Sequence, residues 1–181
     1  MHTQRVIKTS RLLAHILRHR PGPLGITLDN AGWTGTDALL SALAAQGVAL
    51  TRAELDHVVT VDTKRRFAYS EDGRSIRASQ GHTVPVDLRL PTAAPPEVLF
   101  HGTAEGSVES ILREGLRPMA RHDVHLSPNP HTARQVGARR GRPVVLTVNT
   151  AAMTRAGHAF RVSANGVWLT DAVPPQFLAR T

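Results

Sequence analysis

The sequence predicts an α+β protein made of two lobes. Apolar residues recur at helical spacing through much of residues 9–59, whereas short apolar strands alternate with short helices after residue 97. Between these parts, Pro91-Thr-Ala-Ala-Pro-Pro96 is the only linker-like stretch in the chain. We therefore expect a first lobe over residues 1–90, a linker over 91–96 and a second lobe over 97–181.

The first lobe is expected to open with two helices. The first should run from residue 9 or 10 to about Arg18, because Pro21-Gly22-Pro23 prevents its continuation. The second should begin at Thr36, its N-cap, and stop at Gly47. The apolar faces of the two helices are Leu12, Leu13, Ile16, Leu17, Leu39, Leu40 and Leu43.

A third helix and a β-hairpin complete the first lobe. Thr51-Arg-Ala-Glu54 matches a capping box and should open the helix. Residues 66–70 then predict a strand, residues 71–73 a turn and residues 75–78 the returning strand. Three short helices followed by a hairpin is the element order of a winged helix, a common nucleic-acid-binding module.

The second lobe is expected to be mixed α/β with many short strands. Its strongest hairpin signal is Asn165-Gly166. The other expected elements are strands at 98–100, 124–126 and 144–148, a helix at 108–112 that ends at Gly115, and a helix at 132–136.

Charge and composition favour a phosphorylated, nucleic-acid substrate. The net charge is +8, and all the basic residues are Arg except Lys8 and Lys64. Arginine offers a planar fork for bidentate phosphate contacts. Residues 1–90 carry 12 basic and 8 acidic side chains and residues 91–181 carry 10 and 6, so each half has a net charge of +4 and the positive field belongs to the folded body.

The absence of Cys excludes disulfides, thiol catalysis and thiolate zinc sites. No apolar run approaches the roughly 20 residues of a membrane span, and no signal peptide is recognisable, so we expect a cytoplasmic protein.

Four segments place cationic or imidazole groups at predicted loops or element ends: Arg18-His19, Lys64-Arg65-Arg66, His101-Gly102-Thr103 and Arg139-Arg140. Such groups suit chemistry in which phosphate is bound and moved. Each has a structural alternative, namely helix capping, a solvated face, a core histidine and a basic loop tip. Strand alternation would point Arg65 and Arg66 to opposite sides, and Gly102 would let a ligand approach the backbone closely.

Several classes of site are absent from the sequence. The chain has no GxxxxGK[ST], GxGxxG or GxSxG motif, which argues against an ordinary kinase, a Rossmann enzyme and an α/β-hydrolase. His122 and His125 have only Asp123 as a local carboxylate, so we expect no metal site.

Eight segments, in order over nearly the whole chain, resemble the RNA 2'-phosphotransferase family of the KptA type. The chain departs from the family pattern at Asp123, where a His is usual, and at Thr83, where Ser is usual. The segments are Ser10–Pro21, Gly32-Trp33, Arg66-Phe67, Ile76–Thr83, Leu99–Thr103, Val124–Ser127, Val136–Pro143 and Ser163–Thr170.

The resemblance implies a winged-helix RNA-binding lobe over 1–90, an ADP-ribosyltransferase-like, NAD-binding lobe over 97–181, and an active site between them. It implies that the 2'-phosphate of an RNA attacks the nicotinamide ribose of NAD and expels nicotinamide. The 2''-hydroxyl of that ribose then attacks the phosphate. The products are 2'-OH RNA and ADP-ribose 1'',2''-cyclic phosphate. The expected partners are 2'-phosphorylated RNA and NAD, with no metal or membrane, and we expect a monomer.

The resemblance also assigns residues to roles. The family's catalytic set maps onto Arg18, His19, Arg66 and Arg139, with His19 as the better proton donor because arginines stay protonated throughout. The residues expected to line the NAD site are His101, Gly102, Thr103, His125, Leu126, Ser127, Asn165 and Gly166.

Three alternatives remain open. A protein mono-ADP-ribosyltransferase typically relies on a late glutamate, and this chain has no Glu after Glu114. An ADP-ribosyltransferase acting on other nucleic-acid phosphate ends would use the same residues. A non-catalytic, basic winged-helix protein would explain residues 1–90 but would leave the second half without a role.

Overall fold

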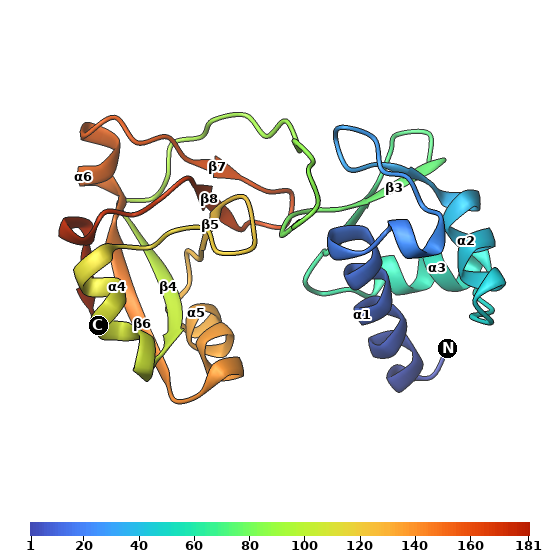
Figure 1. The fold of residues 1–181 in the computed structure, drawn as a ribbon, viewed down its shortest axis with the longest axis horizontal. Helices are drawn as coiled ribbons and strands as arrows, with labels where there is room; N and C mark the ends of the chain where they lie inside the picture. Colours follow the sequence, from blue (N-terminus) through green and yellow to red (C-terminus); the bar gives the residue numbers. More distant parts are fainter. The chain divides into compact units, whose positions relative to one another are not determined.

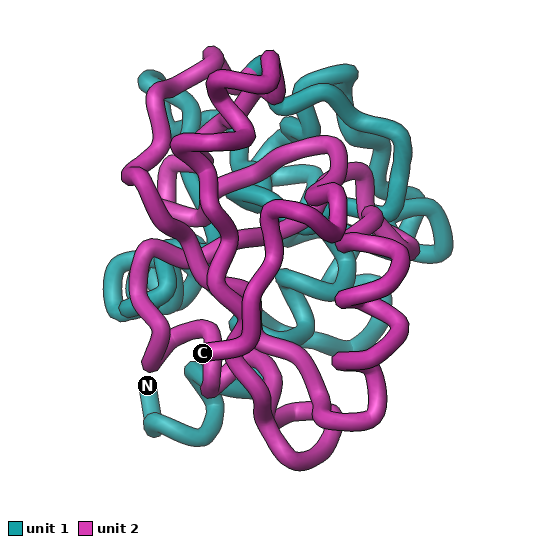
Figure 2. Tube along the Cα trace, turned by 90° about the vertical axis from the view of Figure 1, so that its left-hand side faces the viewer, with its two compact units in different colours: residues 1–89 teal, residues 90–181 magenta.

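The computed structural model describes residues 1–181, which form two compact units, residues 1–89 and residues 90–181 (Figure 2). Helices and small antiparallel sheets occur in both units, which confirms the predicted α+β class. None of the helices is both long enough and apolar enough to cross a membrane.

Three helices form most of the first unit (Figure 1). They are α1 (Thr3–His19), α2 (Thr36–Ala45) and α3 (Arg52–Thr60). Their inward faces meet in one core that contains Leu13, Ile16, Leu17, Leu39, Leu43, Leu55, Val58, Phe67 and Ile76. The short 3-10 helix Gly22–Leu24 follows α1. The helical spacing read from the sequence places Leu13, Ile16, Leu17, Leu39 and Leu43 in this core, and the predicted Leu12 and Leu40 are partly buried against it.

Helix α1 begins at Thr3, about two turns before its predicted start. The expected starting residues, Thr9 and Ser10, are buried inside the helix, and Val6 packs against the core. The residue at the true N-cap, His2, makes no side-chain capping bond, so the sequence carries no start signal there. By contrast, the capping box at the start of α3 is confirmed.

The sheet of the first unit has three short strands in the order β1-β3-β2, all antiparallel. The strands are β1 (Thr34–Gly35), β2 (Phe67–Tyr69) and β3 (Ser75–Ala78). The predicted β2–β3 hairpin is confirmed, and Gly73 supplies the positive φ of its turn, at 67°. Strand β1 was not predicted, because two residues are too few to show a period.

Two sheets organise the second unit (Figure 1). One has the order β4-β6-β9, with β4 (Val98–Ala104), β6 (Pro143–Asn149) and β9 (Leu178–Arg180). The other has the order β5-β8-β7, with β5 (Val124–Leu126), β7 (Arg161–Val162) and β8 (Trp168–Thr170). Side chains that include Leu99, Leu126, Val148, Met153 and Phe160 form the main core.

Helices surround these sheets. They are α4 (Val108–Glu114), α5 (Pro130–Gly137) and α6 (Thr150–Arg155), with 3-10 helices at Glu105–Ser107, Ala138–Arg140 and Pro175–Phe177. Helix α6 and strand β9 were not predicted. The Asn165-Gly166 hairpin is present, with Gly166 at φ 76° in a turn closed by the bond from Ser163 N–H to Val167 O, 2.9 Å.

The proline-containing segment 91–96 is bonded to the second unit. Ala93 N–H donates to the carbonyl oxygen of Phe160 at 2.8 Å, and Thr92 pairs with Arg161 as an isolated antiparallel bridge. The segment therefore leads directly into β4 with part of its backbone already paired.

Candidate functional site

Arg18 and His19 occupy the last turn of α1, as predicted. Thr83 holds this turn from a distant part of the sequence. Its backbone N–H donates to the carbonyl oxygen of Arg18 at 2.9 Å, and its hydroxyl oxygen lies 3.0 Å from Nδ1 of His19. A helix C-terminus favours positive charge through its dipole. The end of α1 therefore favours positive charge, and Thr83 fixes the backbone of Arg18 and the ring of His19 there.

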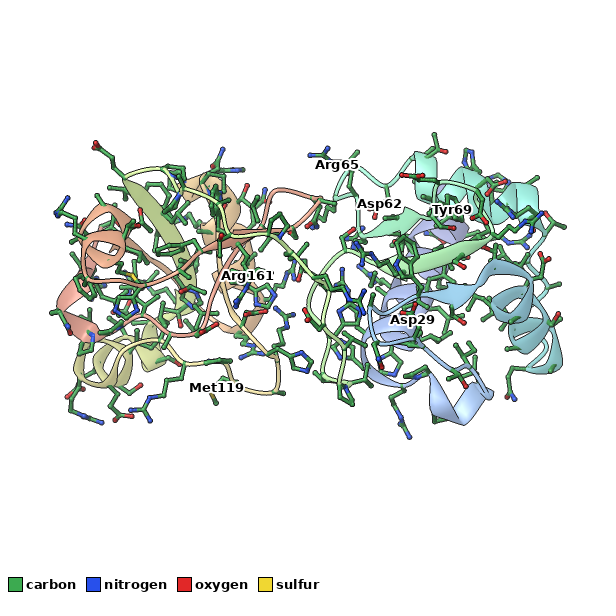
Figure 3. The ribbon with its side chains drawn as sticks, turned by 90° about the horizontal axis from the view of Figure 1, so that it is seen from above. Asp29, Asp62, Arg65, Tyr69, Met119 and Arg161 are labelled. Atoms are coloured by element: carbon green, nitrogen blue, oxygen red, sulfur yellow. The ribbon has the colours of Figure 1, made fainter.

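Arg66 is fixed by a neighbouring carboxylate, that of Asp62. Backbone N–H of Arg66 donates to this carboxylate at 2.7 Å, and the guanidinium of Arg66 forms an ion pair with it. The Asp62 side chain is 5% exposed and the Arg66 side chain 28% exposed. Asp62 and Arg65 are labelled in Figure 3. The turn thus presents Arg66 in one orientation.

The expectation that Arg65 and Arg66 alternate as in a strand is wrong. Arg65 has φ 42°, and its N–H donates to the backbone oxygen of Asp62 at 2.7 Å, so it lies in a tight turn and the strand begins only at Phe67. Phe67, the first residue of β2, is 6% exposed and belongs to the core of the first unit.

One segment joins the Arg66 turn to the end of α1. Ser79 N–H donates to the carbonyl oxygen of Arg66 at 2.8 Å, and the Ser79 hydroxyl donates to that of Arg65 at 2.9 Å. Four residues later, Thr83 bonds to Arg18 and His19. Bonds from residues 79–83 therefore hold the backbone of Arg18 and Arg66 and the ring of His19, three of the four predicted catalytic residues.

His101 lies inside β4, not after the end of a strand as the sequence indicated, because β4 continues to Ala104. Its Nδ1 is 3.2 Å from the carbonyl oxygen of His125. Burial lowers the pKa of His101, and the bond to His125 opposes that shift. A carbonyl can only accept, so Nδ1 carries the proton of the neutral ring and Nε2 offers a lone pair.

Gly102 and Gly137 mark the place where α5 lies against β4 (Figure 1). A Cβ atom on Gly102 would lie 1.7 Å from the carbonyl oxygen of Ala133, and one on Gly137 would lie 2.6 Å from that of Thr103. The close backbone approach expected at Gly102 therefore exists, but helix α5 makes it and not a ligand.

Two arginines follow this crossing, and a third interacts with them through its charge. Arg139 and Arg140 follow α5 in the 3-10 helix Ala138–Arg140 and are exposed. Desolvation lowers the pKa of Arg121, which lies in the loop before β5, and the positive charges of Arg140 and Arg139 lower it further. None of the three forms an ion pair with a carboxylate. Such an uncompensated cluster is suited to bind a phosphate or pyrophosphate.

Arg121 was not predicted from the sequence. Its only sequence signal is its place three residues before β5, in the loop that also contains His122 and Asp123. The sequence alone does not show that the charge of Arg121 interacts with that of Arg139, because the two residues are distant in the chain.

The remaining predicted NAD-site residues differ in what they expose. Leu126 is 2% exposed and packs in the core, so it can offer a ligand only its backbone. The Ser127 hydroxyl donates to the carbonyl oxygen of Asn129, the N-cap of α5, at 3.0 Å. Asn165 accepts a bond of 2.7 Å from the Ser163 hydroxyl. Strands β4 and β5 meet at Phe100 and Ser127, which brings His101 and His125 together.

Asp123 has a structural partner. Nη2 of Arg161, which is labelled in Figure 3, donates to the carboxylates of Asp123 and Asp171 at 2.6 Å each. This ion-pair network connects the residue before β5, the first residue of β7 and the residue after β8. No group of three or more His, Cys, Asp or Glu side chains is arranged to hold a metal ion.

Comparison with known proteins gives a consistent result. The model of a family described as "RNA 2'-phosphotransferase, Tpt1 / KptA family" matches residues 4–172. The chain is similar to a "Probable RNA 2'-phosphotransferase" of Streptomyces griseus, with 57% identity over 98% of both chains. It is also similar to proteins of the same name from Streptomyces coelicolor (58% identity, 98% of this chain and 97% of the relative) and Burkholderia pseudomallei (50%, 94% and 93%).

Proposed function

This chain belongs to the RNA 2'-phosphotransferase family of the Tpt1 / KptA type, and from that membership we propose that it is an NAD-dependent transferase that removes an internal 2'-phosphate from RNA. The observation that supports this most directly is the set of arginine and histidine side chains suited to phosphate, Arg18, His19 and Arg66 in the first unit and Arg139 in the second.

The proposed reaction has two steps. An oxygen of the RNA 2'-phosphate attacks the anomeric carbon of NAD's nicotinamide ribose, and the bond to nicotinamide breaks. The 2''-hydroxyl of the same ribose then gives up its proton and attacks phosphorus, the bond to the RNA 2'-oxygen breaks, and that oxygen takes a proton. The products are 2'-OH RNA and ADP-ribose 1'',2''-cyclic phosphate.

The chain's own residues supply what these steps need. We assign Arg18, Arg66 and Arg139 to the phosphate, since its negative charge must be held while bonds to it form and break. Arginine stays protonated throughout, whereas a histidine ring can give up and regain a proton, so His19 is the proposed donor to the RNA 2'-oxygen. Arg121 joins this set because its charge lies beside Arg139.

The NAD side of the proposal rests on the second unit. A neutral His101 offers the lone pair of Nε2 to a ribose hydroxyl, and its Nδ1 is already committed to the His125 carbonyl. The Arg121, Arg139 and Arg140 cluster has the uncompensated positive charge that a pyrophosphate requires. Thr103, Ser127, Asn165 and Gly166 complete the proposed lining, with backbone from Gly102, His125 and Leu126.

The two units take distinct roles in this proposal. Residues 1–90 would act as the winged-helix RNA-binding lobe, residues 91–96 as the linker and residues 97–181 as the ADP-ribosyltransferase-like lobe. The three helices and the β1-β3-β2 sheet support the first assignment, and the two three-stranded sheets support the second. Monomeric action in the cytoplasm, without a metal, stays a prediction.

The test is incubation of the protein with a short RNA that carries one internal 2'-phosphate, with and without NAD, followed by gel and mass analysis. We expect 2'-OH RNA and a cyclic-phosphate form of ADP-ribose only with NAD. Product RNA that retains ADP-ribose on a terminal phosphate would indicate the alternative acceptor. Salt-sensitive duplex binding with no NAD-dependent product would indicate a non-catalytic binding protein.

A further inference from the structure

We propose that Thr83 is a positioning residue that fixes the proton of His19 on Nδ1, so that Nε2 is the atom that exchanges a proton during the reaction. The inference rests on the proposed function, in which His19 donates a proton to the RNA 2'-oxygen. It concerns the orientation and the tautomer of His19.

The Thr83 hydroxyl has two partners. Its oxygen lies 3.4 Å from the carbonyl oxygen of Arg18 and 3.0 Å from Nδ1 of His19. A carbonyl oxygen has no proton to give, so in the contact with Arg18 the hydroxyl is the donor. In the proposed arrangement this hydroxyl directs its proton to the Arg18 carbonyl and accepts from His19, whose Nδ1 carries the hydrogen.

The backbone around Thr83 holds this hydroxyl in place. Thr83 N–H and Val84 N–H both donate to the carbonyl oxygen of Arg18, at 2.9 and 3.4 Å. That carbonyl is one of the last four of α1, which have no partner inside the helix. Residues 83 and 84 therefore cap the helix, and the hydroxyl approaches His19 from a backbone that cannot easily swing away.

Arg77 fixes the two ends of the segment that carries Thr83. Its Nη1 donates to the carbonyl oxygens of Ala31 and Leu88 at 3.2 and 3.4 Å, and its guanidinium lies 4.4 Å from the ring centre of Trp33. Arg77 itself belongs to β3. The segment 78–88 thus begins in β3, directly after Arg77, and its last residue, Leu88, accepts a bond from the Arg77 side chain.

The chemical consequence concerns the second ring nitrogen. When Nδ1–H is held by a hydroxyl oxygen, neutral His19 has its lone pair on Nε2, and protonated His19 adds its transferable proton there. Without the hydroxyl, the contact that favours the hydrogen on Nδ1 is lost. A fraction of the molecules would then present the wrong nitrogen to the substrate.

The kinetic test compares three variants. Thr83→Val keeps the branched shape but removes the hydroxyl, whereas Thr83→Ser keeps the hydroxyl. The control is Thr147→Val, which removes a hydroxyl that donates to the Ala179 carbonyl in the second unit. We expect Thr83→Val to lower kcat by about ten- to a hundredfold, a share of what general acid catalysis contributes. The KM values for RNA and NAD should change less than about threefold. Thr83→Ser and Thr147→Val should stay within about threefold of the parent protein in kcat. Parent-like kcat for Thr83→Val would overturn the proposal.

A second readout does not require activity. In protein labelled with ¹⁵N at histidine, the two ring nitrogens report which one is protonated, and a His19→Asn variant assigns the signals. We expect the Nδ1–H form of neutral His19 in the parent and in Thr83→Ser, and a mixture of tautomers in Thr83→Val. A dominant Nε2–H form in the parent would refute the proposal. Because the spectrum needs no substrate, it also separates failure of this inference from failure of the proposed function.

Discussion

Gly102 in β4 and Gly137 in α5 face each other so closely that neither position has room for a side-chain carbon. A Cβ atom on Gly102 would meet backbone of α5, and one on Gly137 would meet backbone of β4. Backbone atoms cannot rotate away as a flexible side chain can. The pair therefore sets the distance between the strand that carries His101 and the helix that leads to Arg139.

The crossing predicts that alanine at either glycine destabilises the protein. Gly137 has φ −58°, a helical value, so helix propensity alone would favour alanine by about 1 kcal/mol. The contact should outweigh that gain, and we expect Gly137→Ala to lower the free energy of unfolding by about 2 kcal/mol and Gly102→Ala by about 3 kcal/mol. Urea unfolding measures both.

The matched control is Gly106→Ala. A Cβ there would meet nothing within 4 Å, and Gly106 has no positive φ. Its free energy of unfolding should change by less than about 0.5 kcal/mol. Equal stability of Gly102→Ala and Gly106→Ala would show that α5 and β4 are not held at this distance.

Local signals in the sequence predicted several elements because their causes are local. The capping box at Thr51 and Glu54 needs only four consecutive residues, and the β2–β3 hairpin needs only a turn at Gly73. Strand β6 is visible from the apolar residues between 144 and 148, although its burial alternates along the strand. For such elements the neighbours in sequence are also the neighbours in space.

The parts that the sequence did not predict depend on distant partners. Arg121 is linked to Arg139 by folding, and the Gly102 and Gly137 contact joins residues 35 positions apart. Strand β1 exists because Thr34 and Gly35 pair with β3. Likewise, the sequence motif identified Arg66 as a candidate phosphate ligand, but it did not identify Asp62 as the residue that orients it.

The pair formed by Asp62 and Arg66 gives a second prediction. Asp62→Ala would leave Arg66 without its partner and would remove the acceptor for two backbone N–H groups, those of Lys64 and Arg66. Loss of one partner of a buried pair costs about 3–5 kcal/mol, and the 28% exposure of Arg66 reduces this. We expect a loss of about 2 kcal/mol in urea unfolding, with reduced turnover because Arg66 is no longer oriented.

A double-mutant cycle separates the pair from the turn. With Arg66→Ala as the second change, the coupling free energy should be about 1 kcal/mol or more. The same cycle on Arg113 and Glu114, whose side chains are 66% and 56% exposed, should give less than about 0.5 kcal/mol. A coupling at Asp62 and Arg66 no larger than in this exposed pair would contradict an orienting role.

The arginine cluster predicts opposite effects on activity and on stability. Arg121→Ala and Arg139→Ala should each lower turnover at least tenfold, because charge that stabilises the reacting phosphates is lost. The free energy of unfolding should not fall, since the three like charges repel one another. Arg155→Ala, an exposed arginine in the last turn of α6, is the control and should leave turnover unchanged. If Arg121→Ala retained full turnover while Arg139→Ala did not, Arg121 would have no part in the site.

The same cluster should bind inorganic phosphate. At equal ionic strength, phosphate should raise the Tm of the parent protein more than chloride does, because an ion that binds only the folded state stabilises it. The difference between the two salts should shrink in Arg121→Ala and in Arg139→Ala but not in Arg155→Ala. An identical difference in all four proteins would place phosphate binding elsewhere.

His101 predicts a specific dependence of stability on pH. Burial lowers the pKa of His101 in the folded protein, whereas in the unfolded chain the ring titrates near its ordinary value of about 6.5. Below that pH the unfolded chain therefore binds one more proton at this position than the folded protein does. The free energy of unfolding must then fall as the pH falls below 6.5, by up to about 1.4 kcal/mol per pH unit from this group.

His101→Gln isolates this contribution, because glutamine has an amide N–H that can replace the donor to the His125 carbonyl but has no titrating group. Urea unfolding between pH 5 and 8 should show a shallower decline below pH 6.5 in the variant than in the parent, and parallel curves above pH 7.5. Because both proteins share every other histidine, the difference between the curves belongs to His101. Curves that stay parallel down to pH 5 would mean that His101 takes up a proton as readily in the folded protein as in the unfolded chain, and the neutral ring with its lone pair on Nε2 would then not be the form that meets NAD.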